Sequence, residues 1–345
     1  MIVEMEKSAS EEEIEAVITR IKREKFAARL EKGEERTVVC VLGSNTGGTD
    51  TSIFEVLPGV KKVIRIMSPF KLASRDFRKK DTVVKIGDVE IGGQEVVIIA
   101  GPCAVESKEQ VLSCVELARD LGFKILRGGA FKPRSSPFQF QGLGERGLEI
   151  LAEAREKTGL PVVTEVTSPE KVSLVAKYAD ALQIGARNMQ NYELLKAAGC
   201  AGKPILLKNG IGAKVEELLT AADYLLNCDH CQVVLCERGI NTFRNSETRF
   251  TLDVSAVPVV KRLSHLPVIV DPSHAAGKFY YVPALARAGI AAGADGLIIE
   301  IHPDPKSALC DGSQALTFSD FKRLMPELRK TAEAIGREMS FGKRR

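Results

Sequence analysis

The chain has 345 residues, with 49 Lys and Arg against 45 Asp and Glu, so its formal net charge is +4. This charge is too small for the length to indicate nucleic-acid binding, and no run of about 18 uncharged apolar residues predicts a membrane span. Residues 1–13 are acidic and lack the apolar core of a secretion signal, so we expect a cytoplasmic protein that binds neither nucleic acid nor membrane.

The first 70 residues alternate short β-branched or apolar runs with two helical stretches. We predict strands over residues 2–4, 27–30, 37–42 and 60–66, and helices over residues 10–23 and 49–57. Ser10 precedes three glutamates, which is typical of a capped helix N-terminus. The order βαββαβ predicts a ferredoxin-like domain over residues 1–70.

A charged segment, residues 71–82, is expected to link this domain to the remainder of the chain. Two short apolar runs, residues 83–86 and 89–91, then flank a Gly-Asp pair that is typical of a hairpin turn. We expect this hairpin to begin the second domain, residues 83–345, and to close its bottom.

After residue 95 one pattern repeats: a short apolar run, a polar or glycine-rich patch, and a stretch of helical length. The predicted strands are residues 96–101, 124–128, 162–165, 181–184, 205–208, 233–237, 268–271 and 296–300. Helices are predicted over residues 108–120, 145–158, 169–178, 214–227 and 283–292. Apolar strands that alternate with helices indicate a parallel sheet, and eight units in about 240 residues predict an α/β fold of the (β/α)8 TIM barrel type. An open doubly wound sheet is the alternative, but no G-x-G-x-x-G follows the first strand.

The chain has eight cysteines, which are too sparse for a disulfide framework. Cys228 and Cys231 form a Cys-x-x-Cys pair, and Cys236 follows five residues later. A structural zinc site usually brings a second pair of ligands, and the sequence contains none. We therefore expect these three thiols to pack inside as small apolar groups.

Polar side chains follow the predicted barrel strands, at the end where a barrel builds its active site. They are Cys103, Arg127, Lys132, Arg134, Glu165, Arg187, Lys208, Glu237, Arg238, Asp271, His274, Glu300 and His302. Six of them are cations at one mouth of a nearly neutral chain, so we expect an anion-binding site there.

Three roles are open to Cys103: a nucleophile, a metal ligand or a packing residue. Three further donors, His274, Glu300 and Asp311, follow the last two strands and would face the same mouth. Thiolate, imidazole and carboxylate together suit a transition metal, so the sequence favours a metal site.

Two lysines carry separate signals. Lys132 lies in a loop with neighbouring glycines and Arg134, so its backbone and cations suit phosphate or carboxylate. Lys208 ends an apolar strand and would be partly desolvated, which suits either a Schiff-base nucleophile or an anion clamp.

Six segments together resemble the 3-deoxy-D-arabino-heptulosonate-7-phosphate (DAHP) synthases of type I, in the shorter branch close to the 3-deoxy-D-manno-octulosonate-8-phosphate synthases. They are residues 101–107, 128–137, 183–191, 208–210, 236–239 and 271–274. The resemblance covers residues 70–340 and implies condensation of phosphoenolpyruvate with erythrose 4-phosphate, with release of phosphate, as the first step toward chorismate. Residues 1–70 resemble the regulatory domain of some members, which implies feedback inhibition by tyrosine or phenylalanine. The family also implies a homotetramer.

The resemblance also implies the roles of individual residues. One divalent ion, Mn²⁺, Fe²⁺, Co²⁺ or Zn²⁺, would be held by Cys103, His274, Glu300 and Asp311. Phosphoenolpyruvate would be bound by Arg127, Lys132, Arg187, Lys208 and Arg238, with Glu165 nearby. Erythrose 4-phosphate would meet Lys132, Pro133, Arg134 and Ser135, with Asp311 near its hydroxyls. Lys132 would also act as the proton donor.

Four alternatives compete with this interpretation. An octulosonate synthase would extend arabinose 5-phosphate, but such members carry Lys-Ala-Asn-Arg where this chain has Lys132-Pro133-Arg134. A class I aldolase would form a Schiff base on Lys208. A non-catalytic sensor of aromatic amino acids predicts lost metal ligands, whereas all four positions are filled. A fused chorismate mutase at the N-terminus would be all helical, which the Val- and Ile-rich runs at 37–42 and 60–66 oppose.

Overall fold

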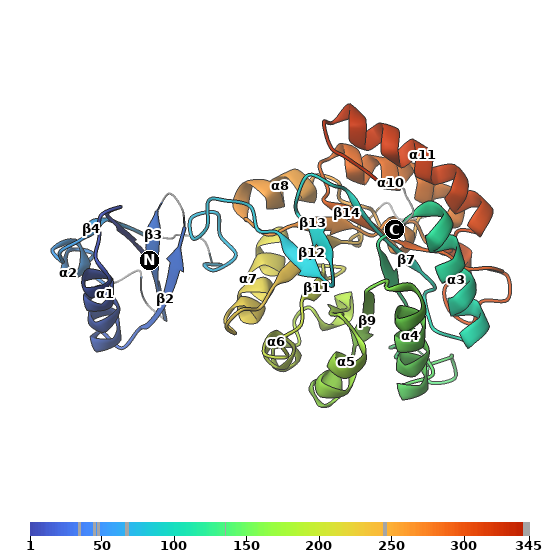
Figure 1. Cartoon of the computed structure of the whole chain (residues 1–345), viewed down its shortest axis with the longest axis horizontal. Coiled ribbons are helices and arrows are strands. Elements are labelled where there is room, and N and C mark those ends of the chain that lie inside the picture. The colour runs from blue at the N-terminus through green and yellow to red at the C-terminus, as the bar shows by residue number, and fades with distance from the viewer. Residues whose placement is uncertain are drawn as a thin grey trace. The chain divides into compact units, whose positions relative to one another are not determined.

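The computed structural model describes residues 1–33, 36–43, 46, 49–65, 69–134, 136–243 and 247–340. The chain divides into two compact units, Met1–Lys80 and Asp81–Arg345 (Figure 1). None of the helices in these ranges is long and apolar enough to cross a membrane.

The first unit is a four-stranded antiparallel sheet with two helices on one face. Its elements are β1 (Ile2–Met5), α1 (Glu11–Arg23), β2 (Ala27–Lys32), β3 (Thr37–Leu42), α2 (Ser52–Glu55) and β4 (Val60–Ile64). The strand order is β2-β3-β1-β4, and Val3 at the centre pairs with Val39 and Val63. This arrangement confirms the predicted βαββαβ order. The end of the last predicted strand, residue 66, lies outside the described residues.

Residue alternation explains how the first unit builds its core. Successive strand side chains point to opposite faces, so Val3 and Val39 share the face that α1 covers with Val17 and Ile21. The predicted cap of α1 is present: the Ser10 hydroxyl accepts from the Glu13 amide at 3.2 Å, and the Glu13 carboxylate accepts from the Ser10 amide at 2.8 Å.

The structure places residues 71–80, assigned above to a linker, in the first unit. Leu72, Ala73 and Phe77 are buried there, and the Arg36 guanidinium donates to the Asp76 carbonyl at 2.8 Å. Apolar side chains spaced among charges in this segment were not recognised as packing residues, because they follow neither a helical nor a strand period.

The second unit is a closed eight-stranded parallel barrel, as predicted. Its strands are β7 (Val97–Gly101), β8 (Ile125–Arg127), β9 (Val162–Val166), β10 (Ala181–Ile184), β11 (Ile205–Lys208), β12 (Val233–Glu237), β13 (Val268–Val270) and β14 (Gly296–Glu300). The last strand closes on the first, with Ile298 beside Ile99. Helices surround these strands on the outside (Figure 1). They are α3 (Lys108–Leu121), α4 (Glu145–Thr158), α5 (Val172–Tyr178), α6 (Tyr192–Gly199), α7 (Val215–Leu226), α8 (Ala256–Leu263), α9 (Pro272–Ala276), α10 (Val282–Ala291) and α11 (Phe318–Ala334).

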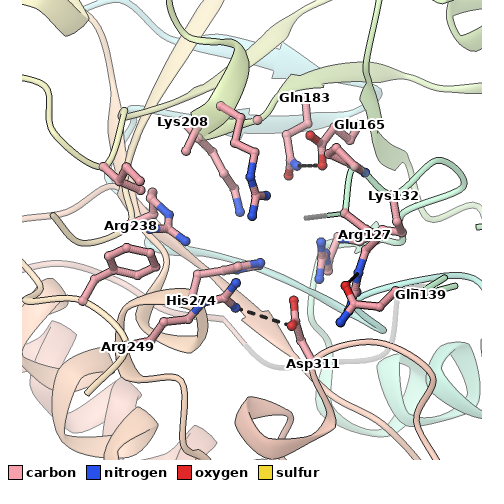
Figure 2. Close-up of a pocket in the computed structure, with 17 residues that line it drawn as sticks. Arg127, Lys132, Gln139, Glu165, Gln183, Lys208, Arg238, Arg249, His274 and Asp311 are labelled. Carbon is pink, nitrogen blue, oxygen red and sulfur yellow. Dashed lines mark hydrogen bonds and ion pairs between the residues drawn. The ribbon is translucent and has the colours of Figure 1, made fainter. Parts of the chain in front are cut away.

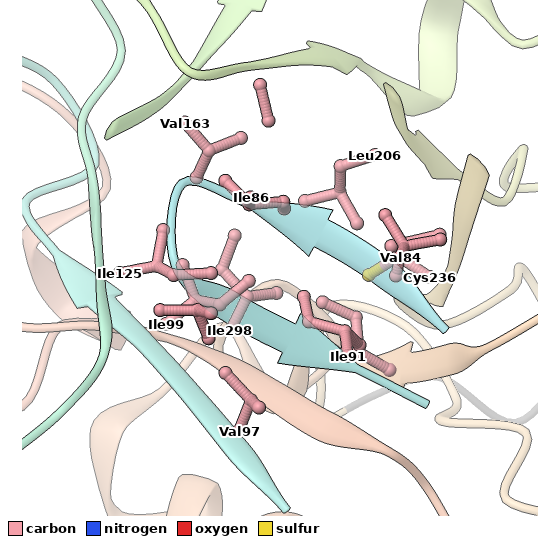
Figure 3. Packing of buried hydrophobic residues seen from close by; sticks show 14 residues of the cluster. Val84, Ile86, Ile91, Val97, Ile99, Ile125, Val163, Leu206, Cys236 and Ile298 are labelled. Atoms are coloured by element: carbon pink, nitrogen blue, oxygen red, sulfur yellow. The ribbon is translucent and has the colours of Figure 1, made fainter. Parts of the chain in front are cut away.

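A hairpin closes the bottom of the barrel. Its strands, β5 (Val84–Ile86) and β6 (Val89–Ile91), place Ile86 and Ile91 against the interior residues Val97, Val163 and Leu206 (Figure 3). Interior side chains at the amino ends of the strands are therefore sealed from water. The opposite, carboxyl ends of the strands remain free to build a site.

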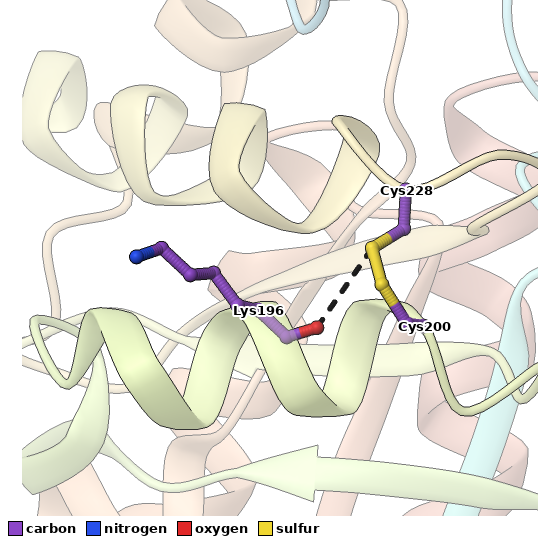
Figure 4. The surroundings of a disulfide bond; sticks show 3 residues. All are labelled: Lys196, Cys200 and Cys228. Carbon is purple, nitrogen blue, oxygen red and sulfur yellow. Dashed lines mark hydrogen bonds between the residues drawn. A yellow bond between two sulfur atoms is a disulfide. The ribbon is translucent and has the colours of Figure 1, made fainter.

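The cysteines differ from the expectation of three buried thiols. Cys236 is buried on β12 as expected, but Cys231 is only partly buried. Cys228 forms a disulfide with Cys200, which joins the ends of α6 and α7 (Figure 4). The cause lies in helix packing: a Cβ on Gly199 would lie 2.8 Å from the Leu225 carbonyl oxygen, so only glycine lets these ends approach so closely.

Candidate active site

The barrel gathers polar side chains at the carboxyl ends of its strands. Arg127, Lys208, Glu237 and Glu300 are the last residues of β8, β11, β12 and β14, and all four are buried. Parallel strands direct their carboxyl ends to one mouth, which explains why residues far apart in sequence meet there.

Four side chains at this mouth could hold a metal ion. One ligand atom from each of Cys103, His274, Glu300 and Asp311 lies within 4.8 Å of the others. His274 Nε2 lies 3.5 Å from Glu300 Oε1, and Cys103 Sγ lies 3.4 Å from Asp311 Oδ2. One sulfur, one imidazole nitrogen and two carboxylates fit a divalent transition metal in both number and chemistry.

His274 is oriented by a buried carboxylate. Asp271 caps α9: its Oδ1 accepts from the His274 amide at 2.9 Å, and its Oδ2 lies 2.7 Å from His274 Nδ1. An ionised carboxylate requires the proton on Nδ1, which leaves the lone pair of Nε2 toward the other donors. Burial lowers the pKa of His274 despite its acidic neighbours, so the ring is neutral at pH 7.

Cys103 lies beside a second buried cysteine, which the sequence did not single out. Cys310 Sγ is 3.2 Å from Cys103 Sγ, and Arg134 Nη1 lies 2.6 Å from Cys310 Sγ. The Cys310 hydrogen bond, burial and the negative charge of Glu300 raise the pKa of the Cys103 thiol well above its ordinary value. Without a metal ion the Cys103 side chain is therefore a neutral thiol at neutral pH.

Glu300 is held by two partners. Arg127 Nη1 lies 2.5 Å from its Oε1, and Gln314 Nε2 donates to its Oε2 at 2.7 Å. Burial alone would raise the pKa of Glu300, but its basic neighbours, His274 and Arg127, lower it strongly. The carboxylate is therefore ionised and ready to bind a cation.

A cavity of about 250 Å³ opens beside these donors (Figure 2). It is lined by seven cationic side chains: Arg127, Lys132, Arg134, Arg187, Lys208, Arg238 and Arg249. Pro133, Glu165, His274 and Asp311 line it as well. The predicted residue Ser135 lies outside the residues that the structure describes.

The cations in the cavity fall into two groups. Arg127 is paired with Glu300, Lys208 with Asp271 and Arg249 with Asp311. Across the described ranges, the other four, Lys132, Arg134, Arg187 and Arg238, have no carboxylate partner within ion-pair distance. Unpaired cations at a mouth of this kind are suited to bind an anionic ligand.

Arg238 and Lys132 are held in different ways. Arg238 stacks on the ring of Phe250, with the guanidinium carbon 4.1 Å from the ring centroid. Burial lowers the pKa of Lys132, but its acidic neighbours, Cys103, Cys310 and Glu165, outweigh this effect and raise it. Lys132 is consequently a cation at neutral pH.

Glu165 is fixed at the cavity wall by its neighbours. Gln183 Nε2 donates to its Oε2 at 3.3 Å, and a Cβ on Gly185 would lie 2.1 Å from its Oε1. A larger residue where β10 ends would therefore displace the carboxylate from this position.

Sequence reasoning missed Arg249, Gln139, Gln183, Phe250 and Cys310, which all lie in or beside this cavity. Gln183 lies in the segment 183–191, but nothing in the sequence marked its side chain as part of a binding site. Arg249 lies on the long connection between β12 and α8, where no strand end indicates its position.

Comparison with known proteins gives consistent matches over both units. The DAHP synthetase I family matches residues 75–337, and the DAHP synthase ferredoxin-like domain matches residues 1–68. A phospho-2-dehydro-3-deoxyheptonate aldolase of Thermotoga maritima is 47% identical over 336 residues, which cover 97% of this chain and 99% of the relative. A 2-dehydro-3-deoxyphosphooctonate aldolase of Citrifermentans bemidjiense is 32% identical and covers only 73% of this chain, with 97% of its own length matched.

Solved structures show the same similarity. A crystal structure of the DAHP synthase of Thermotoga maritima matches with a TM-score of 0.78 and 47% identity, over 98% of this chain and 99% of that one. A truncated form of the Thermotoga maritima enzyme matches with a TM-score of 0.73 and 48% identity, over 79% of this chain and 99% of that one. From its barrel, its N-terminal unit and these matches, the chain belongs to the DAHP synthetase I family.

Proposed function

We propose that the chain is a DAHP synthase, which condenses phosphoenolpyruvate with erythrose 4-phosphate and releases phosphate as the first step toward chorismate. One observation carries this proposal: a four-donor metal set, Cys103, His274, Glu300 and Asp311, adjoins a cavity with seven cations. The two substrates together bring about five negative charges, which such a cluster can offset.

The anion-binding residues divide the cavity between the two substrates. Arg187, Lys208 and Arg238, with Arg127 and Lys132, bind phosphoenolpyruvate in this proposal. Lys132, Pro133, Arg134 and Ser135 bind erythrose 4-phosphate, and Asp311 meets its hydroxyls. Arg187 and Arg238 support the first assignment, because they face the cavity without an acidic partner among the described residues.

Cys103, His274, Glu300 and Asp311 would hold a divalent ion, which would supply Lewis-acid polarisation of the aldehyde of erythrose 4-phosphate. The donor set fits Mn²⁺, Fe²⁺, Co²⁺ or Zn²⁺. Asp271 orients His274. Arg127 and Gln314 orient Glu300. These two donors are therefore already positioned for metal binding.

Bond formation joins C3 of phosphoenolpyruvate to C1 of the aldose phosphate. Lys132 is protonated, and in this proposal it donates a proton to the new alkoxide. Water adds at C2, where positive charge develops; in this proposal Glu165 orients that water from the cavity wall and accepts the proton that it loses. The resulting phosphohemiketal loses phosphate by cleavage of its C2–O bond.

Turnover in ¹⁸O-labelled water tests this sequence of bonds. With phosphoenolpyruvate, erythrose 4-phosphate and Mn²⁺, we expect one phosphate per seven-carbon product, and the phosphate carries no ¹⁸O. Labelled phosphate would indicate attack of water on phosphorus, and phosphate without a seven-carbon product would indicate a phosphatase. Either result contradicts the proposal.

The class I aldolase is opposed by the ion pair between Lys208 and Asp271. A Schiff base requires a free amine to attack the carbonyl carbon, whereas Lys208 Nζ is engaged by the buried carboxylate of Asp271. Borohydride treatment in the presence of pyruvate is therefore expected to leave Lys208 unmodified. A trapped adduct would favour the aldolase.

The N-terminal unit is proposed to bind tyrosine or phenylalanine as a feedback inhibitor. The match of residues 1–68 to the ferredoxin-like domain of DAHP synthases supports a regulatory role. A chain lacking Met1–Lys80 is expected to lose inhibition by these amino acids. Unaltered inhibition of the shortened chain would reject the regulatory role.

We also propose that the protein is cytoplasmic and forms a homotetramer. Light scattering of the purified protein tests the number of subunits.

A further inference from the structure

Arg249 is a cavity residue that belongs to none of the motifs considered above. Its backbone is hydrogen-bonded to the turn that follows His274, because the Arg249 amide donates to the Ala276 carbonyl at 3.1 Å. A Cβ on Gly277, where φ is +68°, would lie 2.5 Å from the Cβ of Arg249. This close approach requires glycine and fixes where the arginine side chain starts.

The guanidinium of Arg249 contacts one metal donor, Asp311, and the side chain of Gln314. Its Nη1 lies 3.4 Å from Asp311 Oδ1 (Figure 2). The same Nη1 lies 3.2 Å from Gln314 Oε1. Gln314 is buried, and its Nε2 donates to Glu300 Oε2 at 2.7 Å. One arginine therefore contacts Asp311 directly and Glu300 through the Gln314 amide.

Of the four metal donors, Asp311 has the most exposed side chain, so its position depends most on the residues that contact it. Its side chain is 22% exposed, whereas that of Glu300 is 1% exposed. Its backbone φ is +47°, a left-handed conformation that residues other than glycine rarely adopt. A carboxylate on a partly exposed turn keeps a fixed position only if its partners hold it there.

We propose that Arg249 is a positioning residue for the metal site. It holds Asp311 directly and Glu300 through Gln314, and its positive charge offsets the excess negative charge of a thiolate and two carboxylates around one divalent ion. This inference rests on the proposed function of the four donors. The competing role, direct binding of substrate phosphate, is also open to an arginine that lines the cavity, and the experiment separates the two.

The test compares Arg249→Met and Arg249→Lys with the wild-type full chain. Metal-free protein is titrated with Co²⁺, and binding is followed by the thiolate-to-cobalt absorption band and by calorimetry. For Arg249→Met we expect the Kd for Co²⁺ to rise about 10–100-fold, the range found when an outer partner of a metal ligand is removed. Arg249→Lys keeps the positive charge but loses the planar guanidinium group, so its Kd for Co²⁺ should lie between the values of the wild type and Arg249→Met.

Two further variants make the test specific. Gln314→Leu removes the link to Glu300 and should also weaken Co²⁺ binding. In the double variant Arg249→Met/Gln314→Leu, the Kd for Co²⁺ should rise by less than the product of the two single fold-changes, because both substitutions break the same chain of contacts. Arg262→Met, on the exposed side of α8, serves as the matched control and should bind Co²⁺ like the wild type.

The outcomes distinguish the inference from the proposed function. A wild-type Kd for Co²⁺ in Arg249→Met, with a raised KM for erythrose 4-phosphate or phosphoenolpyruvate, would overturn positioning and assign substrate binding to Arg249. Failure of the wild-type protein to bind one Co²⁺ through Cys103 would overturn the metal site itself. A weaker Kd for Co²⁺ with unchanged binding of phosphoenolpyruvate to the metal-free protein would support the inference.

Discussion

The Nδ1 atom of His274 lies 2.7 Å from Oδ2 of Asp271, an oxygen that also accepts from Lys208 Nζ. One buried carboxylate thus joins a metal donor to a cation of the anion cavity. Because Asp271 fixes the imidazole with Nε2 toward the metal donors, its charge contributes to metal binding without touching the ion.

Asp271→Asn is expected to weaken metal binding about 10–100-fold. The amide keeps the size of the side chain but loses the negative charge that holds the proton on His274 Nδ1. The Kd for Mn²⁺ or Co²⁺, measured on metal-free protein, checks this prediction. Glu247→Gln, which breaks only the exposed pair with Lys278, is the control and should keep the wild-type Kd. Equal Kd values for the two variants would contradict the role of Asp271.

Cys103→Ser is expected to remove the thiolate-to-cobalt band and to raise the Kd for Co²⁺ by at least about tenfold. The adjacent thiol provides a sharp comparison, because Cys310 Sγ lies only 3.2 Å away but is not among the four donors. Cys310→Ser should therefore retain the band. If instead Cys310→Ser abolished the band and Cys103→Ser did not, the ligand would be Cys310.

Metal binding is expected to release one proton between about pH 7 and pH 9. The raised pKa keeps the Cys103 thiol protonated in the metal-free protein, whereas burial lowers the pKa of His274, so its ring has no proton to lose from Nε2. The apparent Kd for Co²⁺ should then fall about tenfold per pH unit as pH rises. Calorimetry in buffers of different ionisation enthalpy counts the protons, and a pH-independent Kd would show that Cys103 is already a thiolate.

Much of the barrel was predictable from the sequence, because its strands are apolar on both faces and each ends at a polar residue. Glu300 and Lys208 were placed correctly at strand ends for this reason. Arg249 was not, because a long connection and a backbone contact with Ala276 bring it to the cavity. The partnership of Cys310 with Cys103, 207 residues apart, likewise depends on where two loops meet.

The disulfide between Cys200 and Cys228 was missed because pairing cannot be deduced from spacing alone. It closes a segment with a sequence separation of 28, for which loss of chain entropy in the unfolded state predicts about 3–4 kcal/mol of stabilisation. Cys200→Ser should therefore lower the urea midpoint of the oxidised protein. Cys231→Ser, which leaves the disulfide intact, should not, and an equal loss in both variants would contradict the prediction.

The choice of aldose phosphate tests the central claim most directly. Phosphate release from phosphoenolpyruvate should be measured with erythrose 4-phosphate and with arabinose 5-phosphate, each with and without exhaustive chelation. A DAHP synthase that uses the Cys103 metal site predicts rapid release with erythrose 4-phosphate, little with arabinose 5-phosphate, and loss of activity on chelation that added Mn²⁺ restores. Preference for arabinose 5-phosphate, or an unchanged rate after the metal is removed, would contradict this account.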